Sequence, residues 1–176
     1  MGVFMRIFFA FFLLFLPYIL SASNSESEIK VAVLGKVSNF VKYKIPTGND
    51  NFLIVVFRDE KFAKLIENIY INKHINKKNV FVKSITKLEN IKRPDLLYIG
   101  KISQEDQIQL LQYAYENSLF TVSSQSGFAQ RGGVMQLYFS SQKLHFKINL
   151  NAIKKSNLKI SASLLSISTL VKGKKL

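Results

Sequence analysis

The sequence predicts a three-layer α/β domain: a mainly parallel sheet of about six strands, helices on both faces, and a C-terminal antiparallel hairpin at the sheet edge. Two observations carry this prediction. Short apolar runs of strand length alternate with segments of helical periodicity, which is typical of βαβ units. Residues 134–150 hold two apolar-rich segments separated by turn residues, which is typical of a hairpin. The chain has 176 residues and no internal repeat, so we expect one core.

Residues 1–23 have the pattern of a secretory signal peptide. Arg6 is the only charge before Glu26, residues 7–20 are apolar throughout, and residues 21–23 are small. The apolar run is shorter than the roughly 18 residues expected of a spanning helix. An uncleaved N-terminal anchor is the alternative. We expect export to the periplasm, with membrane contact only through this leader or through weak attraction of basic residues to anionic lipids.

The mature domain, residues 24–176, is expected to begin with a helix and a central strand. The apolar residues of 25–42 recur at helical spacing, and residues 46–51 are rich in turn-forming types. Residues 52–57 are continuously apolar, as in a strand covered on both faces. The spacing then predicts a short helix over 62–69 and a second strand over 80–85.

A third strand is predicted at 96–99, followed by a helix that Ser103 caps and that ends near Asn117. Its expected buried face comprises Ile108, Leu111, Ala114 and Tyr115. A fourth strand covers 119–123.

The hairpin strands are predicted at 134–139 and 144–150. Asn151 is expected to cap a short helix that Asn157 ends in the left-handed conformation, and a last helix covers 160–172, with Gly173 ending it.

Composition and motifs favour binding over catalysis. The net charge is +14, but the basic residues are scattered and nearly all lysine, so for an exported protein we predict no nucleic-acid partner. There is no cysteine, and His74 and His145 are expected in solvent, so no metal site or cofactor is predicted. Residues 84–87 read Ser-Ile-Thr-Lys but lack the companion motifs of a serine nucleophile.

A binding crevice is expected where the parallel strands end, because open α/β sheets place ligands at their carboxyl edge. Asp59 follows the first strand, and Ser124 follows the fourth. Arg131 offers a planar fork to a carboxylate or phosphate, with Gln130 beside it, although Arg131 can equally face solvent or order its own turn. The remaining candidates are Phe128 and the glycines Gly132 and Gly133. The alternative for Phe128 is that its side chain is buried in the core under this turn.

The C-terminal third resembles the YfiR family of secreted bacterial proteins. A Phe-Ala-x-x-Gly-Gly turn, a Phe-x-Ile-Asn-Leu strand and a Leu-x-Ile-Ser-x-x-Leu-Leu segment follow one another. The matching residues are Phe128, Ala129, Gly132, Gly133, Phe146, Ile148, Asn149, Leu150, Leu158, Ile160, Ser161, Leu164 and Leu165. Family members often carry paired cysteines that respond to redox state, and this chain departs from that pattern.

The resemblance implies a non-enzymatic periplasmic regulator. Such a protein binds the extracytoplasmic domain of an inner-membrane signalling protein, of the diguanylate cyclase type, and represses it, which lowers cyclic di-GMP and biofilm growth. The alternative is a small-molecule-binding protein that presents a ligand to a membrane sensor kinase or transporter. A hydrolase is a third hypothesis, which the lack of a recognisable nucleophile motif disfavours. Formation of a homodimer is left open.

Overall fold

The computed structural model describes residues 18–43, 48, 50–87 and 93–173, and the side chains from residue 25 onward. In these residues, eight strands form one sheet with the order β10-β8-β7-β6-β5-β2-β4-β3. Five of its seven pairings are parallel, so the predicted fold class is confirmed. The strands are β2 (Phe52–Phe57), β3 (His74–Ile75), β4 (Lys78–Ile85), β5 (Leu96–Ile99), β6 (Thr121–Ser123), β7 (Met135–Ser140), β8 (Lys143–Asn149) and β10 (Thr169–Val171).

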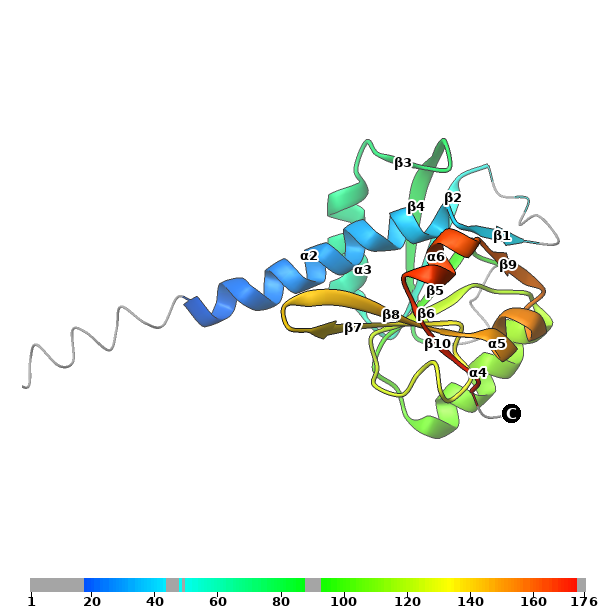
Figure 1. Cartoon of the computed structure of the whole chain (residues 1–176). Coiled ribbons are helices and arrows are strands. Elements are labelled where there is room, and N and C mark those ends of the chain that lie inside the picture. The colour runs from blue at the N-terminus through cyan, green and yellow to red at the C-terminus, as the bar shows by residue number, and fades with distance from the viewer. Residues whose placement is uncertain (1–17, 44–47, 49, 88–92, 174–176) are drawn as a thin grey trace, which may run out of the picture.

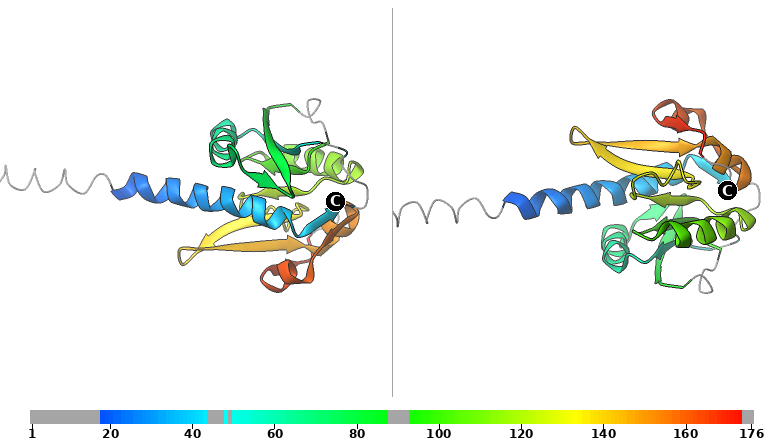
Figure 2. Two further views of the ribbon diagram at one scale, coloured as in Figure 1. Left: turned by 90° about the horizontal axis from the view of Figure 1, so that it is seen from above. Right: turned by 90° about the horizontal axis from the view of Figure 1, so that it is seen from below.

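Helices cover both faces of the sheet (Figures 1 and 2). One face carries α2 (Tyr18–Ser38) and α3 (Glu60–Tyr70), and the other carries α4 (Gln104–Glu116). The short helices α5 (Leu150–Lys155) and α6 (Ala162–Ser166) follow the hairpin. A separate two-stranded sheet pairs β1 (Val41–Tyr43) with β9 (Leu158–Ile160). Three layers therefore enclose two apolar cores.

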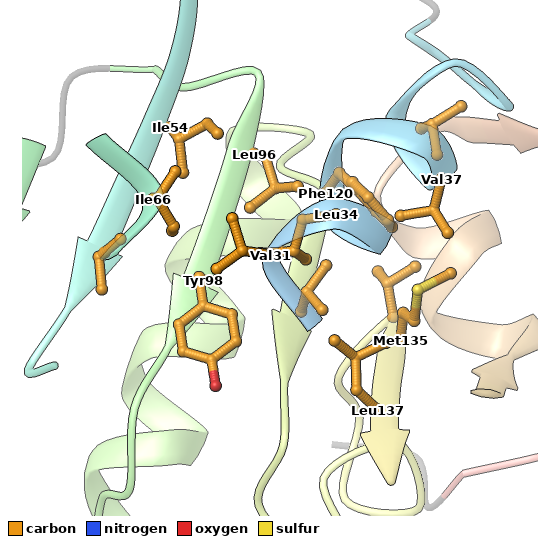
Figure 3. Packing of buried hydrophobic residues seen from close by; sticks show 14 of the residues in the cluster. Val31, Leu34, Val37, Ile54, Ile66, Leu96, Tyr98, Phe120, Met135 and Leu137 are labelled. Carbon is orange, nitrogen blue, oxygen red and sulfur yellow. The ribbon is translucent and has the colours of Figure 1, made fainter. Parts of the chain in front are cut away.

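The alternation of side chains along the central strands builds these two cores. On β2, Ile54 and Val56 face α2 and α3, whereas Val55 and Phe57 face α4. Buried side chains of α2 meet those of β5, β6 and β7 on the first face, as Figure 3 shows for Val31 and Leu34 beside Leu96 and Phe120. A strand buried on both faces has a continuous run of apolar residues, and for this reason β2 and β5 could be predicted at the residues where they lie.

The helix predicted over 25–42 ends earlier than expected. Helix α2 ends at Ser38, and Val41–Tyr43 form β1, because their backbone pairs antiparallel with Leu158–Ile160, far along the chain. The helix begins at Tyr18, inside the predicted leader; the rest of the leader lies outside the described residues. Among the described helices, none combines the length and apolarity needed to cross a membrane. The turn predicted at 46–51 falls largely outside the described residues.

The predicted C-terminal helix over 160–172 is wrong. Ser161 caps the one-and-a-half turns of α6, and Thr169–Val171 then pair in parallel with Lys147–Asn149, adding a strand outside the hairpin. The spacing of Leu164, Ile167 and Leu170 resembled a helical stripe, yet only Leu164 is buried. The sheet therefore has more strands than expected, because β3 and β10 are short edge strands without an apolar run.

Two expectations about helix faces and caps also change. On α4, Ser103 caps the helix as predicted, and Leu111 and Ala114 are buried, but Ile108 is 49% exposed and Leu110 takes its place in the core. The cap of α5 is Asn149, and not Asn151, because the Asn149 side chain accepts from the backbone N–H groups of Asn151 and Ala152.

Candidate functional site

A cleft of about 420 Å³ lies at the carboxyl ends of β2, β5 and β6. Three loops reach it: Asp59 follows β2, Lys101 follows β5 and Ser124 follows β6. The fourth wall is α2, which contributes Ser27 and Lys30. The structure therefore brings Asp59 and Ser124 together at this edge. The remaining lining residues are Phe62, Tyr98, Ile99, Gly100, Ser123, Gln125 and Ser126.

Two aromatic rings and a capped helix hold the cleft in shape. The rings of Phe62 and Tyr98 lie 4.2 Å apart between centroids. The Tyr98 hydroxyl donates to the Ser124 hydroxyl at 3.2 Å. Asp59 caps α3 by accepting from the Phe62 N–H at 3.1 Å. Burial raises the pKa of Tyr98, against the hydrogen bond with Ser124, so the hydroxyl stays a neutral donor at physiological pH.

The charge and polarity of the cleft suit binding of a small polar molecule. Lys30 and Lys101 are its two cations and Asp59 its one carboxylate, surrounded by serine hydroxyls. Neither histidine lines it: His74 lies on β3, and His145 stacks on Tyr138 in the hairpin. Within the described residues, no group of three or more His, Asp or Glu side chains could hold a metal ion. The lining therefore offers hydrogen-bonding groups and charges of both signs.

Arg131 lies outside the lining of this cleft. Its Nε donates to the Gln107 side chain at 3.0 Å, and its Nη2 donates to the Ser126 carbonyl at 2.8 Å. These bonds order the turn that Arg131 belongs to, which is the alternative the sequence left open. Gln130 is half-buried and also does not line the cleft. Ser126 is the link between the Arg131 guanidinium and the cleft wall.

The Phe128–Gly133 turn is part of the core. Phe128 is fully buried under α4, and a Cβ on Gly133 would overlap its ring. Gly132 has φ +110°, which favours glycine, and its carbonyl accepts from the Tyr115 hydroxyl at 2.5 Å. Burial raises the pKa of Tyr115 to about 12. The two glycines therefore serve close packing and backbone conformation in this turn.

Asn149 joins this turn to the C-terminal elements. Its Nδ2 donates to the Ala129 carbonyl at 2.7 Å, and its Oδ1 caps α5 and accepts from the Gly173 N–H at 3.4 Å. The sequence showed Asn149 as part of the resemblance and as one of the polar residues that alternate along the second hairpin strand, yet its side chain is buried. Thus the glycine turn and the second hairpin strand, two segments of the resemblance, meet through one buried amide.

Of the residues that line the cleft, sequence reasoning named only Asp59 and Ser124. Tyr98 and Lys101 could have been found, because they lie at the carboxyl end of the predicted strand 96–99. Ser27 and Lys30 had no such signal, since only the packing of α2 across the sheet brings them to the cleft.

Comparison with known proteins adds a family and a fold. A family model described as YfiR/HmsC-like matches residues 27–169. No curated protein matches the chain. Among solved structures, a substrate-binding protein with adhesive properties from Clostridium difficile, in its ligand-free, open structure, is similar with a TM-score of 0.53 at 13% identity, over 69% of this chain and 55% of that one.

A conserved domain protein from Vibrio cholerae is similar with a TM-score of 0.56 at 12% identity, over 83% of this chain and 60% of that one. The chain thus spans less than two thirds of either structure. At these identities the likeness concerns the fold.

Proposed function

The chain belongs to the YfiR/HmsC-like family, a family of periplasmic regulators, and on that premise we propose that it binds the extracytoplasmic domain of an inner-membrane signalling protein and represses it. The partner is of the diguanylate cyclase type, so repression keeps cyclic di-GMP low. Export through the N-terminal leader and a non-enzymatic mode of action are parts of the same proposal.

The observation that carries the proposal is the extent of the family match. It runs from Ser27 on α2 to Thr169 on β10, so it includes both cores, the glycine turn and the cleft.

Repression by binding has a thermodynamic requirement. The regulator must bind the inactive conformer of its partner more tightly than the active one, because equal affinity shifts nothing. Moving a partner from 99% active to 99% inactive needs about a 10⁴-fold difference in affinity. A single-domain protein can reach this difference in affinity only by binding a surface that one conformer of the partner presents and the other does not.

Deleting the gene tests the proposal. We expect cyclic di-GMP to rise and to return to the starting level when the full chain is restored. A version lacking residues 1–23 should stay in the cytoplasm and fail to restore it. Unchanged cyclic di-GMP after deletion, or full rescue by the leaderless version, would contradict the proposal.

A ligand-binding role is the second candidate, favoured by the cleft at the strand ends. A ligand held there would be presented to a membrane sensor kinase or transporter. The fold likeness to a substrate-binding protein supports this candidate. Thermal shift against a metabolite panel tests it: a ligand of the cleft should raise the melting temperature of the wild type.

Variants then locate the ligand. Lys30→Gln and Asp59→Asn should reduce the shift, and Asn preserves the cap of α3. Arg131→Ala is the comparison: it removes the shift only if the site extends to the glycine turn. A flat panel argues against this candidate.

A further inference from the structure

Strand β4 has an open outer edge. Its inner edge pairs with β2 over Val80–Ile85, whereas on its outer side β3 reaches only Lys78 and Asn79 (Figure 1). The Arg58 N–H at the end of β2 donates to the Ile85 carbonyl. Because backbone groups alternate in direction along a strand, Val80, Val82 and Ser84 direct theirs outward. In the part of the chain that the structure describes, no strand pairs with these outward groups.

Two hollows lie between α3 and this edge of β4, of about 650 Å³ and 480 Å³, and Glu67 lines both of them. The first is lined by Glu60, Ala63, Lys64, Glu67, Lys83, Ser84, Ile85 and Thr86, and the second by Glu67, Asn68, Tyr70, Ile71, Asn72, Lys73, Asn79, Val80 and Val82. Helix α3 thus forms one wall and the open edge the other.

Exposed apolar side chains flank the same edge. Phe81 is 60% exposed on the face of the sheet opposite α3, and Ile71 is 70% exposed where α3 ends. An added strand would therefore find main-chain partners, a helical wall and apolar anchors together, which is how strand addition combines affinity with specificity. The other sheet edge, β10, offers only Thr169–Val171.

We propose that an extended, acidic segment of the membrane partner adds to the sheet beside β4. The proposal rests on the proposed function and names the surface through which it acts. The charge around the edge favours an acidic segment, because four lysines lie on or beside it: Lys73, Lys77, Lys83 and Lys87. Glu67 is the acidic residue that lines both hollows, and Glu60 is paired with Lys64 at 2.8 Å. A second copy of this chain would bring the same lysines, and like charges oppose that pairing.

Photocrosslinking in cells tests the contact. A benzoylphenylalanine residue replaces Phe81, and the matched control places it at Ile108, which is 49% exposed on α4. We expect position 81, but not 108, to crosslink to an acidic extended segment in the extracytoplasmic domain of an inner-membrane signalling protein, identified by peptide mass spectrometry. A crosslink to a second copy of this chain, or no product at 81 beyond that at 108, overturns the proposal.

Repression tests the consequence. In the deletion strain, Phe81→Asp should bind the partner about 30-fold more weakly, as loss of an aromatic hot spot does, and leave cyclic di-GMP high. Ile108→Asp should restore the low level. Val82→Pro removes an outward N–H, a change that edge strands tolerate, and should behave like Phe81→Asp. Circular dichroism and melting of each purified variant identify any that fails to fold.

The two proposals can fail separately. Unchanged cyclic di-GMP in the deletion strain overturns the proposed function. A rise on deletion, followed by full repression from folded Phe81→Asp and Val82→Pro proteins, overturns strand addition alone.

Discussion

Replacing Asn149 should reveal how strongly the glycine turn and the C-terminal elements depend on one side chain. Asn149 is 1% exposed, and its amide bonds the Ala129 carbonyl, the first N–H groups of α5 and the Gly173 N–H. Asn149→Ala removes all of these bonds and leaves the buried Ala129 carbonyl without this donor.

The expected cost follows from two losses. An N-cap replaced by alanine costs about 1 kcal/mol. The Ala129 carbonyl keeps the Gly132 N–H as a donor at 3.2 Å, so losing the Asn149 amide costs about 0.5–1.5 kcal/mol, as for one hydrogen bond. The free energy of unfolding should therefore fall by about 1.5–2.5 kcal/mol, which lowers the melting temperature by about 6 °C for a domain of this size.

Two further variants test these contributions. Asn149→Asp keeps the cap oxygen, but it loses the donor to the Ala129 carbonyl and sets a buried carboxylate oxygen against that carbonyl, so it should cost more than Asn149→Ala. Asn151→Ala tests the cap that the sequence predicts; its side chain makes only a 3.3 Å bond to the Gly173 carbonyl, so the cost should stay below about 1 kcal/mol.

Urea unfolding followed by circular dichroism measures all three variants. A cost for Asn151→Ala equal to or above that of Asn149→Ala would refute the reasoning, because the cap would then belong to Asn151.

Three other predictions concern packing and pH. Gly133→Ala should lower the free energy of unfolding by about 1–3 kcal/mol, measured by urea titration, because its Cβ would overlap the buried Phe128 ring. Leu34→Ala should cost about 2–5 kcal/mol in the same assay, since Leu34 is fully buried, whereas the half-exposed Ile29→Ala should cost under about 0.5 kcal/mol; equal costs would show that α2 is not docked as described. Burial raises the pKa of Tyr115 from 10.0 to about 12, so the neutral hydroxyl contributes fully to the free energy of unfolding below pH 10, and this contribution is lost as the pH rises towards 12. The urea midpoint of Tyr115→Phe should therefore fall less steeply over this pH range than that of the wild type.

The elements with strong local signals were predictable. The central strands β2 and β5 were readable because strands buried on both faces must be apolar at every position. The start of α4 could be predicted because an N-cap residue carries a side-chain acceptor three residues before the backbone N–H that donates to it. Ser103 accepts from the Asp106 N–H at 3.0 Å.

The candidate site was predictable only in part. Asp59 and Ser124 follow parallel strands, so the rule for carboxyl edges brings them to one cleft. The same rule also led us to expect Arg131 and Gln130 near the crevice, whereas Arg131 lies outside the cleft lining, because its position depends on the path of its loop and on Gln107 of α4.

Local preference, read along the chain, therefore determined the α/β class, the central strands and the strand-end location of the cleft, because these depend on side-chain periodicity and on short-range capping. Contacts between distant segments decided the rest. The pairing of Val41–Tyr43 with Leu158–Ile160, the pairing of β10 with β8 at the sheet edge, and the placement of Lys30 over the cleft each depend on contacts between segments that are not neighbours in the sequence. Such segments adopt whichever backbone conformation satisfies their hydrogen bonds against the already folded core, and only the tertiary structure specifies that partner.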